Sequence, residues 1–293
     1  MTKIQTEKIV SFDQTELNAY REGEQGPWMC LSNGLGGSYS AWEPYCERFR
    51  ETHRLLSWDY RGLFNSGKCA DPSAVDVPSQ AQDLLALLDH YEVKSAVHVG
   101  WSMGVQVLLE LVRIAPERID ALILIGGASG NPFDTAVDGG PVARMIRPFI
   151  EKLHALEPIF GPYASRVVPL VPQATSVMKM MGVVRHSADD KLLKNIASEW
   201  VKLDFDCYLE TFKQLGEHDA SDVLPSVNVP TLIVVGDKDI MTPVSVSEAM
   251  HAQITGSELF VIRNGTHYVP VEYSELLNLR VEKFLDEHLA TES

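Results

Sequence analysis

Residues 100–104 read Gly-Trp-Ser-Met-Gly, and this stretch decides the fold. The apolar residues 96–100 predict a buried strand just before it, and residues 105–114 predict a buried helix just after it. A serine flanked by these glycines at a strand-to-helix junction is typical of a nucleophile elbow, a sharp turn that presents the hydroxyl group above the sheet. A side chain two positions to either side would clash in such a turn, which accounts for both glycines. The sequence therefore predicts Ser102 as a nucleophile.

Apolar strands and helices alternate on both sides of this turn. Strands are predicted over residues 28–32, 53–58, 96–100, 119–125, 231–235 and 259–262, and helices over residues 41–49, 79–91, 105–114, 244–252 and 276–289, with a hairpin over residues 8–12 and 17–21. Alternation of this kind indicates β-α-β units. We therefore expect an α/β protein with a mostly parallel central sheet that is flanked by helices.

The alternation stops between residues 131 and 216. This stretch has no convincing core strand, short apolar helical pieces at residues 178–184 and 192–203, and prolines at positions 141, 148, 158, 162, 169 and 172. The pattern predicts an inserted helical cap. Residues 1–130 and 217–293 would then form the core, and residues 131–216 the cap.

The predicted nucleophile needs a base, because a serine hydroxyl reacts weakly at neutral pH. Histidine has a suitable pKa, about 6.5, and the chain has 9 histidines. His267 lies in a loop, Asn-Gly-Thr-His-Tyr at residues 264–268, just after the last predicted strand. Functional groups gather at the carboxyl ends of such strands. His98, by contrast, lies inside a predicted strand and is expected to be packed there, so His267 is the predicted general base.

Two aspartates compete for the role of the acid that orients His267. Residues 236–239 read Gly-Asp-Lys-Asp and follow the strand at residues 231–235 directly. In this chain order the acid should lie between the serine and the histidine. Asp239 lies further into the loop and can reach across, whereas Asp237 is closer to the turn and can cap it. Asp239 is the favoured acid, and whether Asp237 can replace it stays open.

A glycine-rich loop at residues 33–37, Asn-Gly-Leu-Gly-Gly, predicts one half of an oxyanion hole. The two backbone N–H donors would come from Met103, which follows the nucleophile, and from Leu35, with Gly34 as the alternative. Asn33 is expected to hydrogen-bond within this loop. No Lys-Ser/Thr pair follows the glycines, which excludes a Walker A phosphate loop.

Candidate substrate contacts are Gly34, Trp101, Met180, Met181 and Tyr268. Trp101 either contacts the substrate or packs under the cap. The two methionines either line an acyl pocket or form the core of the cap itself. Few charges occur in the middle of the cap, so we expect an apolar pocket closed by a mobile lid.

The motifs together resemble the α/β-hydrolase superfamily over nearly the whole chain outside the cap. They include Trp42 after the glycine loop and the stretch Asp-Tyr-Arg-Gly at residues 59–62. Residues 32–36, Ser-Asn-Gly-Leu-Gly, look like the oxyanion loop of 3-oxoadipate enol-lactonases, where many other relatives carry His-Gly. The resemblance implies a serine hydrolase that cleaves a carboxylic ester of a small apolar substrate through an acyl-enzyme.

Other activities stay open at this point. A lactonase, an acyltransferase, a perhydrolase and a C–C bond hydrolase would use the same three residues, and substrate choice depends on the cap rather than on the fold. A non-catalytic binding protein is disfavoured because serine, acid and histidine are all present. Nothing in the sequence requires a metal or an organic cofactor.

The composition excludes several other classes of function. The 293 residues carry a formal net charge of −15, which would repel a nucleic-acid backbone. No apolar run reaches transmembrane length, and no secretory signal or lipidation motif is apparent at the N-terminus. The 4 cysteines have neither metal-ligand nor redox spacing. We expect a cytoplasmic enzyme with a small-molecule substrate, and the oligomeric state stays open, a homodimer included.

Overall fold

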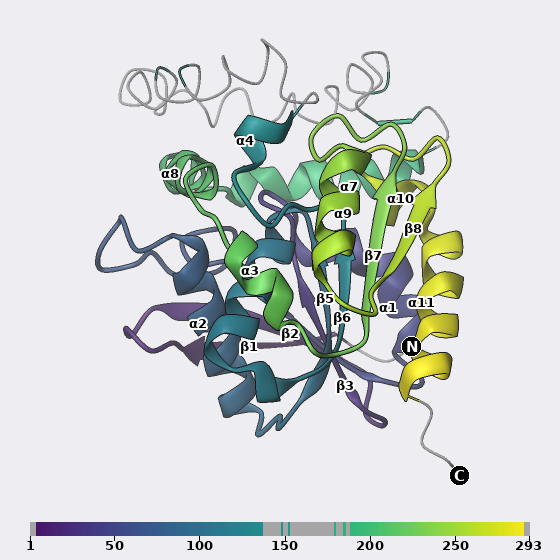
Figure 1. Ribbon diagram of the computed structural model, residues 1–293. Helices are drawn as coiled ribbons and strands as arrows, with labels where there is room; N and C mark the ends of the chain where they lie inside the picture. The colour runs from purple at the N-terminus through teal and green to yellow at the C-terminus, as the bar shows by residue number, and fades with distance from the viewer. Residues whose placement is uncertain are drawn as a thin grey trace.

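The computed structural model describes residues 4–136, 148, 152, 179, 184–185 and 188–289. Within them, a central 8-stranded sheet has the strand order β1-β2-β4-β3-β5-β6-β7-β8 (Figure 1). The strands are β1 Gln5–Val10, β2 Glu16–Glu22, β3 Trp28–Ser32, β4 Arg54–Trp58, β5 Ala96–Trp101, β6 Ile119–Ile125, β7 Thr231–Gly236 and β8 Glu258–Ile262. Every predicted strand is present, with bounds that differ by a few residues at most.

Most strand pairs in this sheet are parallel. Strand β2 runs antiparallel to both β1 and β4, whereas β4, β3, β5, β6, β7 and β8 pair in parallel. All side chains of β5 and β7 are buried, as expected of parallel strands that are covered on both faces. The expected α/β class with a mostly parallel sheet is therefore confirmed.

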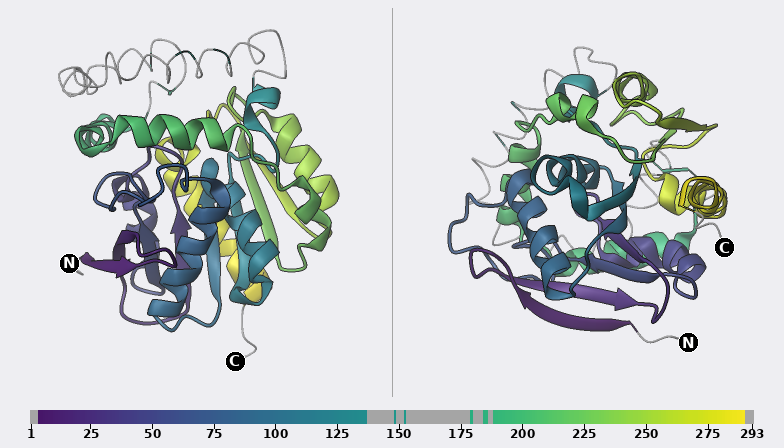
Figure 2. Two further views of the ribbon diagram at one scale, coloured as in Figure 1. Left: turned by 90° about the vertical axis from the view of Figure 1, so that its left-hand side faces the viewer. Right: turned by 60° about the horizontal axis from the view of Figure 1, so that its bottom comes forward.

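Helices cover both faces of the sheet (Figure 2). Helices α2 Val77–His90 and α3 Met103–Ile114 pack together on one face, and α1 Glu43–Phe49 and α11 Ser274–Leu289 pack together on the other. Each face has its own cluster of buried apolar side chains. In the described part of the chain, no helix combines the length and the apolar character needed to cross a membrane.

Helix α2 shows how the local sequence sets the element bounds. Its N-cap Asp76 accepts a hydrogen bond from the Ser79 backbone N–H, 2.7 Å away, and a proline occupies the first turn. The helix therefore begins at Val77, two residues before the predicted start. Leu84 and Leu87, on its apolar face, are fully buried.

A long insertion separates β6 from β7, although the two strands pair directly. Its described helices are α4 Pro132–Thr135, α7 Asp190–Glu199 and α8 Phe205–Leu215, with two 3₁₀ elements, η5 Trp200–Lys202 and η6 Ser221–Ser226. Figure 1 shows α7 and α8 above the carboxyl ends of the parallel strands. The helix predicted over residues 192–203 is present as α7 and η5. The piece predicted over residues 178–184 lies largely outside the described residues, and the division into core and cap stays a prediction.

Candidate active site

Ser102 lies in a strained turn between β5 and α3. Its φ and ψ of 55° and −117° fall outside the regions that residues with a side chain usually adopt. A Cβ at Gly100 would lie 2.7 Å from the Gly104 carbonyl group, and a Cβ at Gly104 would lie 2.2 Å from the Ser32 carbonyl oxygen. The turn therefore requires both glycines, for the steric reason expected from the sequence.

His267 lies beside Ser102 in the loop after β8. Its Nε2 is 2.8 Å from the Ser102 Oγ, and its Nδ1 is 2.9 Å from Oδ2 of Asp239. A carboxylate only accepts hydrogen bonds, so Nδ1 carries the proton and Nε2 faces the hydroxyl as an acceptor. The Ser102 hydroxyl is thus aligned to give its proton to Nε2.

Asp239 is 5% exposed, and both of its oxygens have partners. Oδ1 accepts from the backbone N–H groups of Met241 and Thr242, both at 2.9 Å, and Oδ2 accepts from the Thr242 hydroxyl at 2.8 Å as well as from His267. These hydrogen bonds replace the hydration that the carboxylate loses on burial. Asp237 instead accepts from the Asn264 N–H at 2.6 Å and so joins two loops. The structure brings Asp239, and not Asp237, to His267.

The glycine-rich loop at residues 33–37 lies directly against the elbow. A Cβ added to Gly34 would be 3.2 Å from the Ser102 Cβ, and the Gly37 N–H donates to the Gly34 carbonyl at 2.8 Å to close the turn. Met103 is the first residue of α3, where backbone N–H groups have no partner within the helix. Among the described residues, neither the Met103 nor the Leu35 N–H donates a hydrogen bond. Both predicted donors are therefore free to bind an anion.

Asn33 anchors this loop to the neighbouring elements, so the expectation of bonds within the loop was wrong. Its Nδ2 donates to the Trp58 carbonyl at 3.0 Å, its Oδ1 accepts from the Trp42 indole, and its carbonyl accepts from the Tyr60 hydroxyl at 2.6 Å. Both polar atoms of the Asn33 amide group are therefore engaged outside the loop. The same bonds explain why Trp42 and Tyr60 accompany the glycine loop.

Trp101 binds the loop that carries His267. It is 4% exposed, its indole N–H donates to the His267 carbonyl at 2.9 Å, and its ring packs edge-on against those of Trp42 and Tyr268. These contacts correspond to the packing alternative, and substrate contact by Trp101 stays a prediction.

Of the other candidate contacts, Tyr268 follows His267 directly and is half-buried. Burial, aided by the charges of Asp239 and Glu272, raises the pKa of its phenol to about 12, so that it keeps its proton at neutral pH. Met180 and Met181 lie outside the described residues.

Two aromatic residues of the insertion reach this site without having been predicted. The Trp200 indole N–H donates to the Gly36 carbonyl at 2.9 Å. Gly36 has a φ of +76°, and a Cβ there would lie 3.1 Å from the Tyr208 ring and 3.2 Å from the Trp200 ring. The insertion therefore holds the glycine-rich loop from above. The only sequence signal was an unusual density of aromatic residues between positions 200 and 212.

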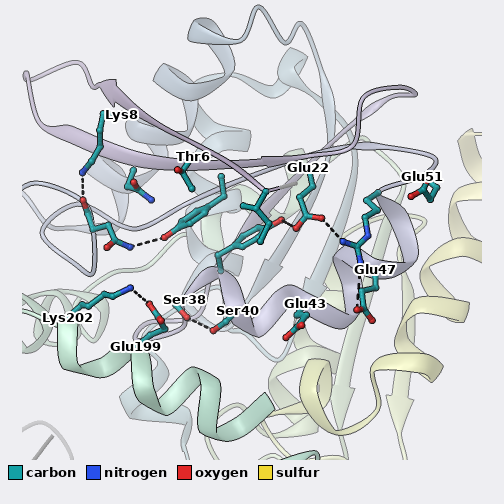
Figure 3. Close-up of a pocket in the computed structure, with 16 residues that line it drawn as sticks. Thr6, Lys8, Glu22, Ser38, Ser40, Glu43, Glu47, Glu51, Glu199 and Lys202 are labelled. Atoms are coloured by element: carbon teal, nitrogen blue, oxygen red, sulfur yellow. Dashed lines mark hydrogen bonds and ion pairs between the residues drawn. The ribbon is translucent and has the colours of Figure 1, made fainter. Parts of the chain in front are cut away.

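A separate cavity of about 1180 Å³ lies between the N-terminal hairpin, η1 Tyr39–Trp42, α1 and η5 (Figure 3). Several of its charged groups are paired with one another. Glu22 accepts from the Tyr39 hydroxyl at 2.8 Å and from Arg50 at 3.0 Å, and Glu199 pairs with Lys202 at 2.7 Å. Ser102, His267 and Asp239 are not among its lining residues. The cavity is thus distinct from the candidate active site.

Comparison with known families covers most of the chain. Residues 27–152 match the family model described as alpha/beta hydrolase fold, and residues 194–290 match the model described as TAP-like protein. The first match contains Ser102, and the second contains Asp239 and His267.

Individual relatives are distant but span nearly the whole chain. A protein of Rhizobium rhizogenes, provisionally named carbamate hydrolase RutD, is 26% identical over 87% of this chain and 91% of its own length. The 3-oxoadipate enol-lactonase 2 of Acinetobacter baylyi is 25% identical over 87% of each chain. The structure of an esterase from Exiguobacterium antarcticum superposes with a TM-score of 0.77 at 23% identity, covering 96% of this chain and 100% of that one. The last comparison shows the fold alone.

Proposed function

The chain has the fold of the α/β hydrolases, and on that premise we propose that it is a serine hydrolase of carboxylic esters, lactones included. One observation carries the proposal: an unbroken row of hydrogen bonds from the Ser102 Oγ through His267 to a buried Asp239. The likeness to a 3-oxoadipate enol-lactonase supports it, since a lactone is a cyclic ester. The 26% identity to a protein named as a carbamate hydrolase supports attack on a carbonyl carbon more generally.

The proposed reaction has two halves. In the first, the Ser102 Oγ attacks the ester carbonyl carbon while its proton passes to His267 Nε2. The carbonyl oxygen becomes an oxyanion, which the N–H groups of Met103 and Leu35 bind. The C–O bond to the leaving group then breaks, and Nε2 returns the proton to the departing alkoxide.

In the second half, water replaces the alcohol. The oxygen of the water attacks the acyl carbon while His267 Nε2 takes one of the water's protons. The N–H groups of Met103 and Leu35 bind the second oxyanion. Collapse of this intermediate breaks the bond to Ser102, whose Oγ recovers the proton from Nε2. Asp239 accepts the hydrogen bond from Nδ1 throughout and stabilises the imidazolium that forms in each half of the reaction.

The substrate is proposed to be small and apolar, with the cap over residues 131–216 deciding its shape. The described part of that segment already supplies Trp200 and Tyr208 above the glycine-rich loop. Their rings favour an apolar group over a charged one next to the reacting carbonyl. A preference for charged acids or alcohols would contradict this part of the proposal.

We further propose that the enzyme works in the cytoplasm. All four cysteines are free, and burial raises the pKa of the Cys46 thiol to about 12 and also that of Cys207 to about 12. Unpaired thiols are typical of proteins in a reducing compartment. Fractionation of the source cells tests this proposal, and recovery of the protein outside the cytoplasmic fraction would contradict it.

The test is the hydrolysis of a p-nitrophenyl ester series and of simple lactones by the wild type, Ser102→Ala and Ser245→Ala. Ser245 is an exposed serine of α9 Val244–Gln253 and serves as the matched control. We expect turnover by the wild type and by Ser245→Ala, and a loss of about 10⁴-fold or more in Ser102→Ala. Comparable turnover by Ser102→Ala would refute the serine mechanism.

Adding a competing nucleophile to the same assay separates hydrolysis from acyl transfer. Alcohols, amines and hydrogen peroxide can each replace water in the second half of the reaction. We expect the free acid to remain the main product. A product that carries the added nucleophile in excess over the free acid would make the protein an acyltransferase or a perhydrolase that uses the same residues.

A further inference from the structure

Glu272 holds the residue that precedes His267. It lies at the end of the short helix α10 Val269–Glu272, close behind the histidine in the chain. Its Oε2 accepts from the Thr266 backbone N–H at 2.9 Å, and its Oε1 accepts from the Thr266 hydroxyl at 2.7 Å. The Thr266 Oγ1 in turn accepts from the Tyr268 N–H at 3.2 Å. One carboxylate thus fixes both the backbone and the side chain of Thr266, which is 4% exposed.

The same carboxylate also binds the insertion. Glu272 Oε1 accepts from the Arg185 backbone N–H at 2.7 Å. Arg185 makes a second bond to this loop, from its Nη1 to the Asn264 carbonyl at 3.1 Å. Arg185 belongs to the chain between β6 and β7, so the insertion and the histidine loop meet at Glu272.

We propose that Glu272 is a positioning residue for His267 and that it makes the placement of His267 depend on the insertion at Arg185. This inference rests on the proposed role of His267 as the general base. Two contacts hold His267 in place. Trp101 donates a hydrogen bond to the His267 carbonyl, and Glu272 binds Thr266, the residue just before His267. If the contact between Glu272 and Thr266 is lost, the loop that carries His267 can move even though Trp101 still binds it. The imidazole ring can then turn away from its 2.8 Å contact with Ser102.

This role differs from a general contribution to stability. Glu272 has no described contact with Ser102, with Asp239 or with the glycine-rich loop, so its loss should leave substrate binding nearly unchanged. A misplacement of reacting groups by about 1 Å can cost as much as 10²-fold in rate. Removing Glu272 should therefore lower kcat and leave KM close to its wild-type value.

The test compares two pairs of variants with a control. Glu272→Ala removes the acceptor, whereas Glu272→Gln keeps one oxygen for Thr266. Thr266→Val removes the hydroxyl donor, whereas Thr266→Ser keeps it. Glu248→Ala removes an exposed glutamate of α9 as the matched control.

We expect kcat to fall about 10- to 100-fold in Glu272→Ala, less in Glu272→Gln and Thr266→Val, and little in Thr266→Ser and Glu248→Ala. KM should stay within about twofold throughout. The rate of fluorophosphonate labelling should fall in the same order, since it reports on Ser102 and His267 without an ester substrate.

Amide hydrogen exchange measures the loop itself and does not depend on the reaction. Exchange in peptides that cover residues 263–272 should be faster in Glu272→Ala than in the wild type and in Glu248→Ala, with the rest of the described core unchanged. Wild-type protein that neither labels nor hydrolyses would refute the proposed function, whatever the exchange result. Active wild-type protein together with a Glu272→Ala variant of unchanged kcat and unchanged exchange would overturn the inference about Glu272 alone. A rise in KM at constant kcat would overturn it as well.

Discussion

His267 Nε2 lies 2.8 Å from the Ser102 Oγ, although 165 positions separate the two residues in the chain. Strand β5 delivers the serine, and the loop after β8 delivers the histidine. Both strands end at the same edge of the parallel sheet, which is why residues so distant in sequence meet there. The Trp101 indole N–H bridges the two elements by donating to the His267 carbonyl at 2.9 Å.

Replacement of Asp239 by asparagine tests the acid of the site. The amide group retains the size of the side chain but presents a poorer partner to Nδ1, which favours the wrong tautomer of His267. We expect kcat to fall by about 10⁴-fold with little change in KM. The measurement is steady-state ester hydrolysis near neutral pH.

Asp237→Asn is the matched control for that change. Asp237 joins two loops through the Asn264 N–H, and an asparagine oxygen can accept the same bond. Its activity should stay within about twofold of wild type. A large loss in Asp237→Asn with little loss in Asp239→Asn would reverse our choice between the two aspartates.

Trp200→Phe tests the hold of the insertion on the glycine-rich loop. Phenylalanine keeps the aromatic contact but removes the N–H that donates to the Gly36 carbonyl. A neutral hydrogen bond of this kind contributes about 1 kcal/mol, so we expect a drop of about fivefold in kcat/KM. The same change at Trp28, a half-buried residue of β3 that stacks on Arg54, should have no such effect. Equal losses in the two variants would argue against a specific role for Trp200.

The sheet and the reacting residues could be predicted because their signals are local. The elbow needs two glycines around one serine, and His267 and Asp239 each follow directly on an apolar strand. Strand alternation then places these loops at one edge of the sheet. Asp239 was preferred to Asp237 because it lies further into the same loop and can therefore reach the histidine.

What the sequence did not reveal are contacts between distant segments. Trp200 and Glu272 carry no motif, and their roles arise only because the insertion returns to the loops at Gly36 and Asn264. Asn33 likewise was expected to form hydrogen bonds within its own loop, but its side-chain amide donates to the Trp58 carbonyl instead. Side-chain partners of this type depend on tertiary packing, which hydrophobic periodicity does not encode.

His98 should make the stability of the protein sensitive to acid. It is fully buried in β5, and burial lowers its pKa from the usual 6.5 to about 4. Its Nε2 is 3.1 Å from the Arg118 carbonyl, which only accepts, so the neutral ring carries its proton there. Between pH 6.5 and 4 the unfolded chain binds this proton and the folded chain does not. The neutral ring therefore makes its full contribution to the free energy of unfolding above pH 6.5, and this contribution is lost as the pH falls towards 4.

Urea unfolding at pH 7 and pH 5 measures this effect. The change from pH 7 to pH 5 corresponds to a loss of roughly 2 kcal/mol from His98. In His98→Gln, which can still donate to Arg118, the fall in the free energy of unfolding should be smaller than in wild type by about that amount. His251→Gln, at an exposed position of α9, serves as the matched control, because no ion pair is described for this histidine. Identical pH dependence in all three proteins would contradict the assignment to His98.

The central claim is that Ser102 is a nucleophile activated by His267, and fluorophosphonate labelling followed by peptide mass mapping tests it most directly. The claim predicts a single adduct on the peptide that contains Ser102 in the wild type, no adduct in Ser102→Ala, and much slower labelling in His267→Ala. An adduct on a different residue, or equal labelling of the wild type and Ser102→Ala, would contradict it.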